Sequence, residues 1–145
     1  MEDTLRIEQL KNISPNVLDE LIALSRELHK DQRVTTLEEV TAIVHNPNIV
    51  LMTAVDNGRI VGMGTLYIIQ KLGRRTAYVE DVVVSEACRG KGAGRKIMEA
   101  LLDAARARGV QSVSLTSRAE RVAARTLYES LGFTQYETGV FKLKL

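Results

Sequence analysis

Residues 88–98 read CRGKGAGRKIM, and this stretch decides how the rest of the chain is interpreted. Its three glycines and four basic residues separate a β-branched run at 82–84 from apolar residues at helical spacing, which begin at Ile97. The pattern predicts a strand, a glycine loop and a helix. Glycines let an anion approach the main chain, and free N–H groups at a helix N-terminus bind phosphate. The alternative interpretation is a glycine turn at the start of a solvated basic helix.

Two familiar phosphate-binding patterns do not fit this loop. A Walker loop that begins at Gly90 needs a glycine where Arg95 stands. A dinucleotide fingerprint that begins at Gly90 fails at the same position, and one that begins at Gly92 needs a glycine where Ile97 stands. What remains is an anion site of another kind, made by the loop amides and the basic side chains beside them.

Working outward from the loop, periodicity and turn residues predict the other elements. Ser14 followed by Pro15 marks one helix start, and the capping-box spacing of Thr36 and Glu39 marks a second. The Asn-Gly pair at 57–58 predicts a tight hairpin turn. Strands are expected at 5–10, 48–56, 59–72, 74–85, 110–117 and within 133–145. Helices are expected from 15 to 28, from 36 to about 45, from the loop to Gly109, and at 121–131. A capping-box pair, Ser117 and Glu120, precedes the last of these helices. The expected order is β-α-α-β-β-β-α-β-α-β-β.

Length and composition limit the classes of function. Neither a repeat nor a linker divides the 145 residues, so we expect residues 1–145 to form a single domain. A formal net charge of +2 and an aromatic content of 4% argue against a nucleic-acid partner, which needs a basic field or stacking platforms. The single cysteine, Cys88, excludes an intramolecular disulfide and fits a reducing compartment. No apolar signal segment or membrane span is visible, so we expect a cytoplasmic protein with no membrane partner.

Two motifs resemble one family. RGKGAG at 89–94, placed after a strand, is similar to the acyl-CoA pyrophosphate signature of the GNAT superfamily of N-acetyltransferases. AARTLYESLGF at 123–133 resembles the second motif of that superfamily. The resemblance extends over nearly the whole chain and implies an α/β (α+β) GNAT fold, a mostly antiparallel mixed sheet of six to seven strands flanked by about four helices. The chain looks most like small stand-alone prokaryotic members, and EDVVV at 80–84 is similar to the glucosamine-phosphate acetyltransferases.

The resemblance implies that acetyl-CoA is the cosubstrate. It also implies that the acceptor is a primary amine of a small molecule or peptide, and that this amine attacks the acetyl group directly in a ternary complex. The strand before the loop then offers its backbone to the pantetheine arm at Val82, Val83 and Val84. The pyrophosphate is expected on the loop and helix start, at Arg89, Gly90, Lys91, Gly92, Ala93, Gly94, Arg95 and Lys96. On the last helix, further cofactor contacts are expected from Arg121, Ala124, Arg125 and Tyr128.

The tyrosine of the second motif is Tyr128, which the resemblance makes the donor to the departing thiolate. A phenol can donate at neutral pH. Arg121, Arg125 and Tyr128 recur at spacings of four and three residues and therefore share one helix face. Many family members have asparagine at the place of Arg121, so Arg125 is the better phosphate candidate. The alternative role for Tyr128 is that of a core tyrosine.

Glu80 and Asp81 interrupt an apolar strand just before the valines, where relatives often place a carboxylate near the acceptor amine. Adjacent strand residues point to opposite faces, so only one of the two is expected to reach the site. We favour Glu80 as the base or amine-orienting group and assign Asp81 to substrate binding. Strand-end ion pairs are the alternative for both, and an acceptor of modest pKa needs no base. Arg118 is either a substrate-binding group for a carboxylate or phosphate, or a surface arginine.

The remaining reactive side chains give weaker signals. Cys88 borders the cationic loop, but most lone cysteines behave as small hydrophobes. His29 and His45 lie near the ends of the first two expected helices, where they can cap them, and no metal site is expected. We therefore predict an acetyl-CoA-dependent N-acetyltransferase, for which a homodimer is a candidate assembly. The alternative is a non-catalytic acyl-CoA-binding or protein-interaction domain with the same fold.

Overall fold

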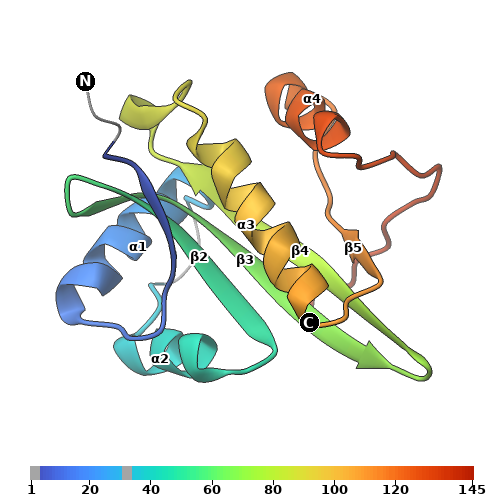
Figure 1. The fold of residues 1–145 in the computed structure, drawn as a ribbon, viewed down its shortest axis with the longest axis horizontal. Coiled ribbons are helices and arrows are strands. Elements are labelled where there is room, and N and C mark those ends of the chain that lie inside the picture. The colour runs from blue at the N-terminus through green and yellow to red at the C-terminus, as the bar shows by residue number, and fades with distance from the viewer. Residues whose placement is uncertain (1–3, 31–33) are drawn as a thin grey trace. The chain divides into compact units, whose positions relative to one another are not determined.

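The computed structural model describes residues 4–30 and 34–145, and the chain divides into two compact units. The first unit spans residues 1–115, and the second spans residues 116–145. All five strands of the described chain lie in the first unit (Figure 1). The expectation that residues 1–145 act as a single domain stays a prediction.

The first unit is built on one mixed sheet with the strand order β1-β2-β3-β4-β5. Neighbouring strands are antiparallel except β4 and β5, which are parallel. The hairpin between β2 and β3 turns at Asn57 and Gly58, whose φ angles of 51° and 77° confirm the turn expected from this pair. The strands are β1 (Arg6–Gln9), β2 (Ile49–Asp56), β3 (Arg59–Lys71), β4 (Arg74–Val84) and β5 (Ser112–Ser114).

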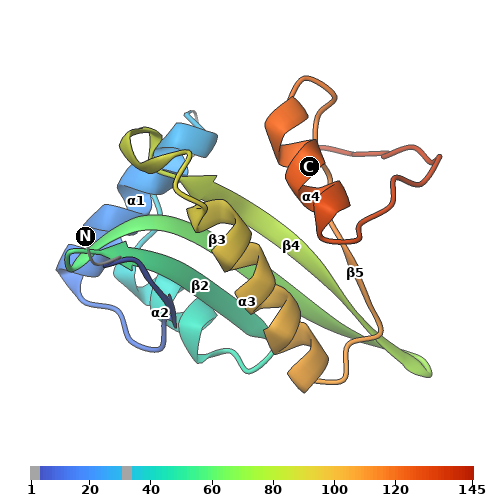
Figure 2. The same ribbon diagram turned by 45° about the horizontal axis from the view of Figure 1, so that its top comes forward.

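Two helices, α1 (Pro15–Leu28) and α2 (Leu37–His45), cover one face of the sheet, and α3 (Ala93–Ala107) covers the other (Figure 2). Ser14 caps α1 through its hydroxyl, and the Thr36 hydroxyl caps α2 by accepting from the Glu39 N–H, as expected, while it donates to the Glu39 carboxylate. Buried leucines and valines of α1 and α2 pack on Leu51, Met63 and Val83 of the sheet. This packing places the C-terminal end of α1 beside β4.

Helix α3 packs closely on the sheet because two glycines of β3 lie beneath it. A Cβ added at Gly62 would stand 3.0 Å from Ile97 Cδ1, and one added at Gly64 would stand 2.9 Å from Ile97 Cγ2. Ile97 and Leu101 are completely buried at this contact. The side chains of Val82 and Val84 reach the same positions from β4, so these two valines face α3 while Val83 faces α1.

Strand β4 contains a bulge that the sequence pattern did not indicate. Val83 pairs with Met63 and Glu80 pairs with Thr65, so Asp81 and Val82 together lie opposite the single residue Gly64. Asp81 adopts a φ of 55°, a left-handed conformation that is strained for a residue with a Cβ. The bulge lies near the C-terminal end of β4, four residues before the 3-10 turn that leads to the glycine loop.

The second unit contains α4 (Val122–Ser130), which confirms the last expected helix, but not its expected cap. The pair Ser117 and Glu120 forms no capping box, because α4 begins after Arg121 and the Ser117 hydroxyl is buried without a partner among the described residues. The prediction of strands within 133–145 is wrong for this structure. Alternating apolar residues form a strand only beside a partner, and Phe141 and Leu143 are exposed here by 99% and 82%. Within residues 4–30 and 34–145 the sheet therefore has five strands rather than six to seven, with four α-helices as expected.

Candidate active site

The glycine loop connects a 3-10 turn (Glu86–Cys88) to the N-terminus of α3. Gly90 and Gly92 have φ angles of 83° and 80°, and nothing lies within 4 Å of a Cβ added at either position. The first helical bond of α3 runs from the Lys96 N–H to the Gly92 carbonyl, so the Ala93 and Gly94 amides precede the intrahelical ladder. Open space beside left-handed glycines and helix N-terminal amides is the geometry that admits an anion.

Two basic side chains of this region make contacts within the first unit. The Arg89 guanidinium donates to the Val84 carbonyl at 3.2 Å and lies 3.8 Å from Glu27, which also accepts from the Glu86 N–H. Arg95 pairs with Glu99 one turn along α3 at 3.1 Å. Arg89 therefore ties the loop to the end of β4 and to α1, a role that the sequence analysis did not foresee.

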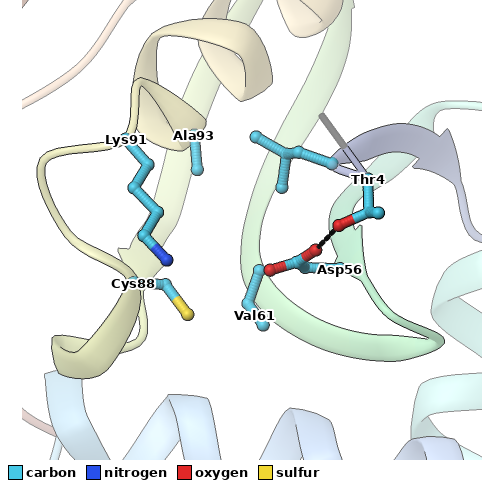
Figure 3. A pocket seen from close by; sticks show the side chains of 7 residues that line it. Thr4, Asp56, Val61, Cys88, Lys91 and Ala93 are labelled. Carbon is cyan, nitrogen blue, oxygen red and sulfur yellow. Dashed lines mark hydrogen bonds between the residues drawn. The ribbon is translucent and has the colours of Figure 1, made fainter. Parts of the chain in front are cut away.

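A cavity of about 190 Å³ lies on the side of the loop that faces the β2–β3 hairpin. Figure 3 shows the Lys91 amine and the Cys88 thiol directed into this space, with the Asp56 carboxylate on the opposite wall, where it accepts a hydrogen bond from the Thr4 hydroxyl. A carboxylate in the wall repels phosphate oxygens. The cavity therefore suits a diphosphate less well than the helix N-terminus does.

Strand β4 has an open edge next to the loop. On the side away from β3, residues 76–78 pair with β5, and no strand of the described first unit faces residues 79–84 there. This segment includes Val82, Val83 and Val84. Its main chain can therefore accept an extended molecule in the way that a sheet accepts another strand.

A histidine–carboxylate contact lies where α1 ends against the bulge of β4, within electrostatic reach of a tyrosine. His29, which follows α1, lies with Nε2 3.2 Å from Oδ1 of Asp81. Burial raises the pKa of Tyr67 on β3 above its ordinary value, and the negative charges of Asp81 and Glu80 raise it further. The Tyr67 phenol is therefore neutral and lies within the electrostatic reach of both carboxylates.

Regular alternation along β4, which the sequence pattern implied for Glu80 and Asp81, is broken by the bulge and by the left-handed φ of Asp81. That only one of the two carboxylates reaches the acceptor site stays a prediction. Glu80 lies opposite Thr65, two residues along β3 from Met63, and therefore shares the face that α1 covers. The sequence analysis missed Tyr67 altogether and gave His29 no role beyond a helix end.

In the second unit, Tyr128 lies on α4 and is buried, with its ring edge-to-face against Phe133 at a centroid distance of 6.0 Å. Burial raises the pKa of Tyr128 above its ordinary 10.0, and the Arg121 charge opposes this shift. The phenol therefore keeps its proton at neutral pH. Arg121 is the N-cap residue that precedes α4, and its charge acts on the Tyr128 phenol.

The Arg125 side chain forms hydrogen bonds within the second unit. Its guanidinium donates to the Ser117 carbonyl at 2.7 Å, to the Arg118 carbonyl at 3.1 Å and to the Gln135 side chain at 3.4 Å. These bonds hold the segment before α4. Its neighbour Ala124 is partly buried, whereas the Arg118 side chain is exposed. Of the two arginines on this helix face, Arg125 thus holds its own chain, a role that its spacing did not reveal.

Among the described residues, no three side chains of His, Cys, Asp or Glu gather into a group able to hold a metal ion. None of the described helices combines the length and the apolar character that crossing a membrane requires.

Comparison with known proteins decides the family. Residues 15–133 match the model of the acetyltransferase (GNAT) family. The chain belongs to the GNAT family of acetyltransferases. A glucosamine 6-phosphate N-acetyltransferase of Trypanosoma brucei brucei is 37% identical over 83 residues, which cover 55% of this chain and 54% of the relative, about half of its length. The rice glucosamine 6-phosphate N-acetyltransferase 1 is 29% identical over 136 residues, 90% of this chain and 81% of the relative.

The solved structures agree with this assignment. A putative acetyltransferase from Agrobacterium tumefaciens superposes on this acetyltransferase with a TM-score of 0.80 and 29% identity, over 99% of this chain and 100% of the other. The GNAT fold expected from the two motifs is therefore confirmed, with five strands in the described chain.

Proposed function

We propose that this acetyltransferase transfers the acetyl group of acetyl-CoA to a primary amine of a small molecule, which attacks directly in a ternary complex. The observation that carries the proposal is the combination of an open β4 edge and an α3 N-terminus joined by one short glycine loop. The edge suits an extended amide-containing arm, and the amides beside Gly90 and Gly92 suit a diphosphate. These are the two chemical parts of the arm of coenzyme A.

The residues of the chain divide the chemistry between them. The acceptor nitrogen bonds to the acetyl carbon while the carbon–sulfur bond breaks, and the thiolate takes a proton from Tyr128. Glu80 accepts the proton that the amine releases and passes it to water, from which Tyr128 is protonated again. Burial supports the acid role, because it keeps the Tyr128 pKa above its ordinary value. The cofactor contacts expected from Arg121, Ala124 and Arg125 remain proposals, and so does substrate binding by Arg118.

A phosphorylated amino sugar is the first acceptor to test. Two of the relatives are named for glucosamine 6-phosphate, and EDVVV at 80–84 resembles that group. The exposed guanidinium of Arg118 offers a partner for a sugar phosphate. Spermidine, an amine without a phosphate, tests whether the acceptor needs the anion.

Tyr128→Phe tests catalysis, because it removes one oxygen and keeps the ring contact with Phe133. General acid catalysis contributes about 10²- to 10⁴-fold, so we expect a fall of that size in kcat for the better acceptor. The acetyl-CoA dissociation constant and the melting temperature should change little. The control is Tyr136→Phe, at a tyrosine that is 81% exposed in the same unit. An unchanged kcat with chemistry rate-limiting would remove Tyr128 from the mechanism.

A non-catalytic acyl-CoA-binding domain gives a different result. In that case the wild-type protein binds acetyl-CoA but releases no CoA thiol with any amine, so there is no kcat for Tyr128→Phe to lower. The cytoplasmic location, the homodimer, independence of metal and the absence of a nucleic-acid or membrane partner also stay predictions.

A further inference from the structure

The histidine that follows α1 holds one carboxylate of the β4 bulge. His29 and Asp81 are 52 residues apart in sequence, and Nε2 of the imidazole lies 3.2 Å from Oδ1 of the carboxylate. Both side chains are about two-fifths exposed, at 41% and 39%. The pair is therefore formed within the fold yet remains open to a molecule that approaches from solvent.

The two partners are fixed from opposite sides. The His29 main chain is tied to α1 by its N–H bond to the Ser25 carbonyl, and α1 is anchored by the buried side chains of Leu21 and Leu24. Asp81 is fixed by the bulge, where the backbone is held at a φ of 55°. The imidazole thus bridges a rigid helix end and a strained strand residue, which leaves the carboxylate few orientations.

The surroundings of the pair limit what Asp81 can do. His29, which follows α1, contacts Asp81, and the charges of Asp81 and of its chain neighbour Glu80 both act on Tyr67 of β3. Tyr67 is neutral and can donate. A histidine donor satisfies one oxygen of Asp81 and leaves the other able to accept from a ligand N–H group.

We propose that His29 is a positioning residue of the acceptor site: it fixes the Asp81 carboxylate so that Asp81 orients the acceptor amine beside Glu80. This inference rests on the proposed acetyl transfer, because it needs an amine at the bulge. Asp81 binds the N–H groups of the acceptor, and Glu80 takes the proton that is lost. His29 acts only through Asp81 and does not touch the acetyl group.

The first experiment compares variants of the two histidines of the chain. His29→Phe keeps a ring but removes the donor, and His29→Gln keeps an amide donor at similar reach. His45→Phe is the matched control, at the exposed end of α2. Steady-state constants are measured with glucosamine 6-phosphate and with spermidine at saturating acetyl-CoA, together with the KM for acetyl-CoA and the melting temperature.

We expect His29→Phe to raise the acceptor KM about 10- to 100-fold, the size expected for loss of a hydrogen bond to a charged group. The KM for acetyl-CoA should stay unchanged, His29→Gln should recover most of the loss, and His45→Phe should alter nothing. An unchanged acceptor KM in His29→Phe overturns the proposal. So does an equal loss for both substrates accompanied by a lower melting temperature, because that is the result of a merely structural histidine.

A second variant tests whether His29 acts through Asp81. In an Asp81→Asn background, His29→Phe should add no further rise in the acceptor KM, whereas independent roles would multiply. Imidazole ¹⁵N NMR gives a readout without turnover: the Nε2 resonance of His29 should shift in Asp81→Asn, because the group 3.2 Å from Nε2 changes from a carboxylate to an amide. An unchanged Nε2 resonance overturns the pairing.

Failure of the proposed function looks different from failure of this inference. If the wild type acetylates neither amine, the proposed function fails and the positioning role fails with it, while the NMR result on the histidine pair stands by itself. If the wild type acetylates an amine and His29→Phe leaves its KM unchanged, only the positioning role fails.

Discussion

The contact between α3 and β3 gives the sharpest test of how the sheet positions the glycine loop. An alanine Cβ at position 64 would lie 2.9 Å from Ile97 Cγ2 and 3.1 Å from Leu101 Cδ1, and both side chains are completely buried. The γ-carbon of a β-branched side chain cannot move without the helix. We therefore expect Gly64→Ala to lower the free energy of unfolding by about 1–3 kcal/mol, the usual cost of overpacking.

Gly62→Ala should cost less, because its nearest neighbour is the terminal Ile97 Cδ1 at 3.0 Å. The difference between the two glycines leads to a prediction for double variants. Ile97→Val removes Cδ1 but keeps both γ-carbons, so it should relieve the Cδ1 contact of Gly62→Ala, though not its 3.2 Å contact with the Val83 carbonyl, and leave the clash of Gly64→Ala in place. Gly139→Ala is the control, because its nearest neighbour lies at 4.0 Å.

Urea unfolding of the single and double variants measures these free energies, and each double-mutant cycle isolates the coupling of one glycine to Ile97. A stabilising coupling for position 62 and none for position 64 is the expected pattern. A cost below about 0.5 kcal/mol for Gly64→Ala, or equal relief at both positions, would refute the reasoning from these distances. Helix α3 would then be able to shift away from an added methyl group, and its close packing on the glycines would not fix the position of the glycine loop relative to the sheet.

Three further predictions concern the site. Gly92→Ala should cost about 1–2 kcal/mol in stability, as should Gly58→Ala at a similar φ, but only Gly92→Ala should weaken acetyl-CoA binding in calorimetry. Arg125→Lys loses the bridge to the Ser117 and Arg118 carbonyls, so local hydrogen exchange before α4 should speed up, with no such change in Arg121→Lys. Burial raises the Tyr128 pKa above its ordinary value of 10.0, and the phenol must be protonated to act as an acid. We therefore expect kcat to fall only as the pH rises beyond 10.0. A Tyr128-dependent fall in kcat well below that pH would contradict the assignment.

The sequence was sufficient to predict local structure wherever interactions between residues close in the chain determine it. The hydroxyls of Ser14 and Thr36 cap helices α1 and α2, and the Asn-Gly pair turns the first hairpin, because each needs only partners within a few residues. The strand, glycine loop and helix around residues 88–98 are likewise local. Together with the second motif, they were enough to indicate the GNAT family, which the family match confirms.

Only the tertiary structure decided the arrangement at the bulge of β4. Regular alternation predicts opposite faces for Glu80 and Asp81, but with the bulge opposite Gly64 the Asp81 carboxylate contacts His29, and the charges of both carboxylates act on Tyr67. Residue spacing cannot reveal a bulge, because it depends on the register between two strands. The strands within 133–145 failed for the same reason, because a strand needs a partner strand that lies outside any local pattern. The capping box at Ser117 failed because α4 begins only after Arg121, so Ser117 lies too far before the helix to cap it.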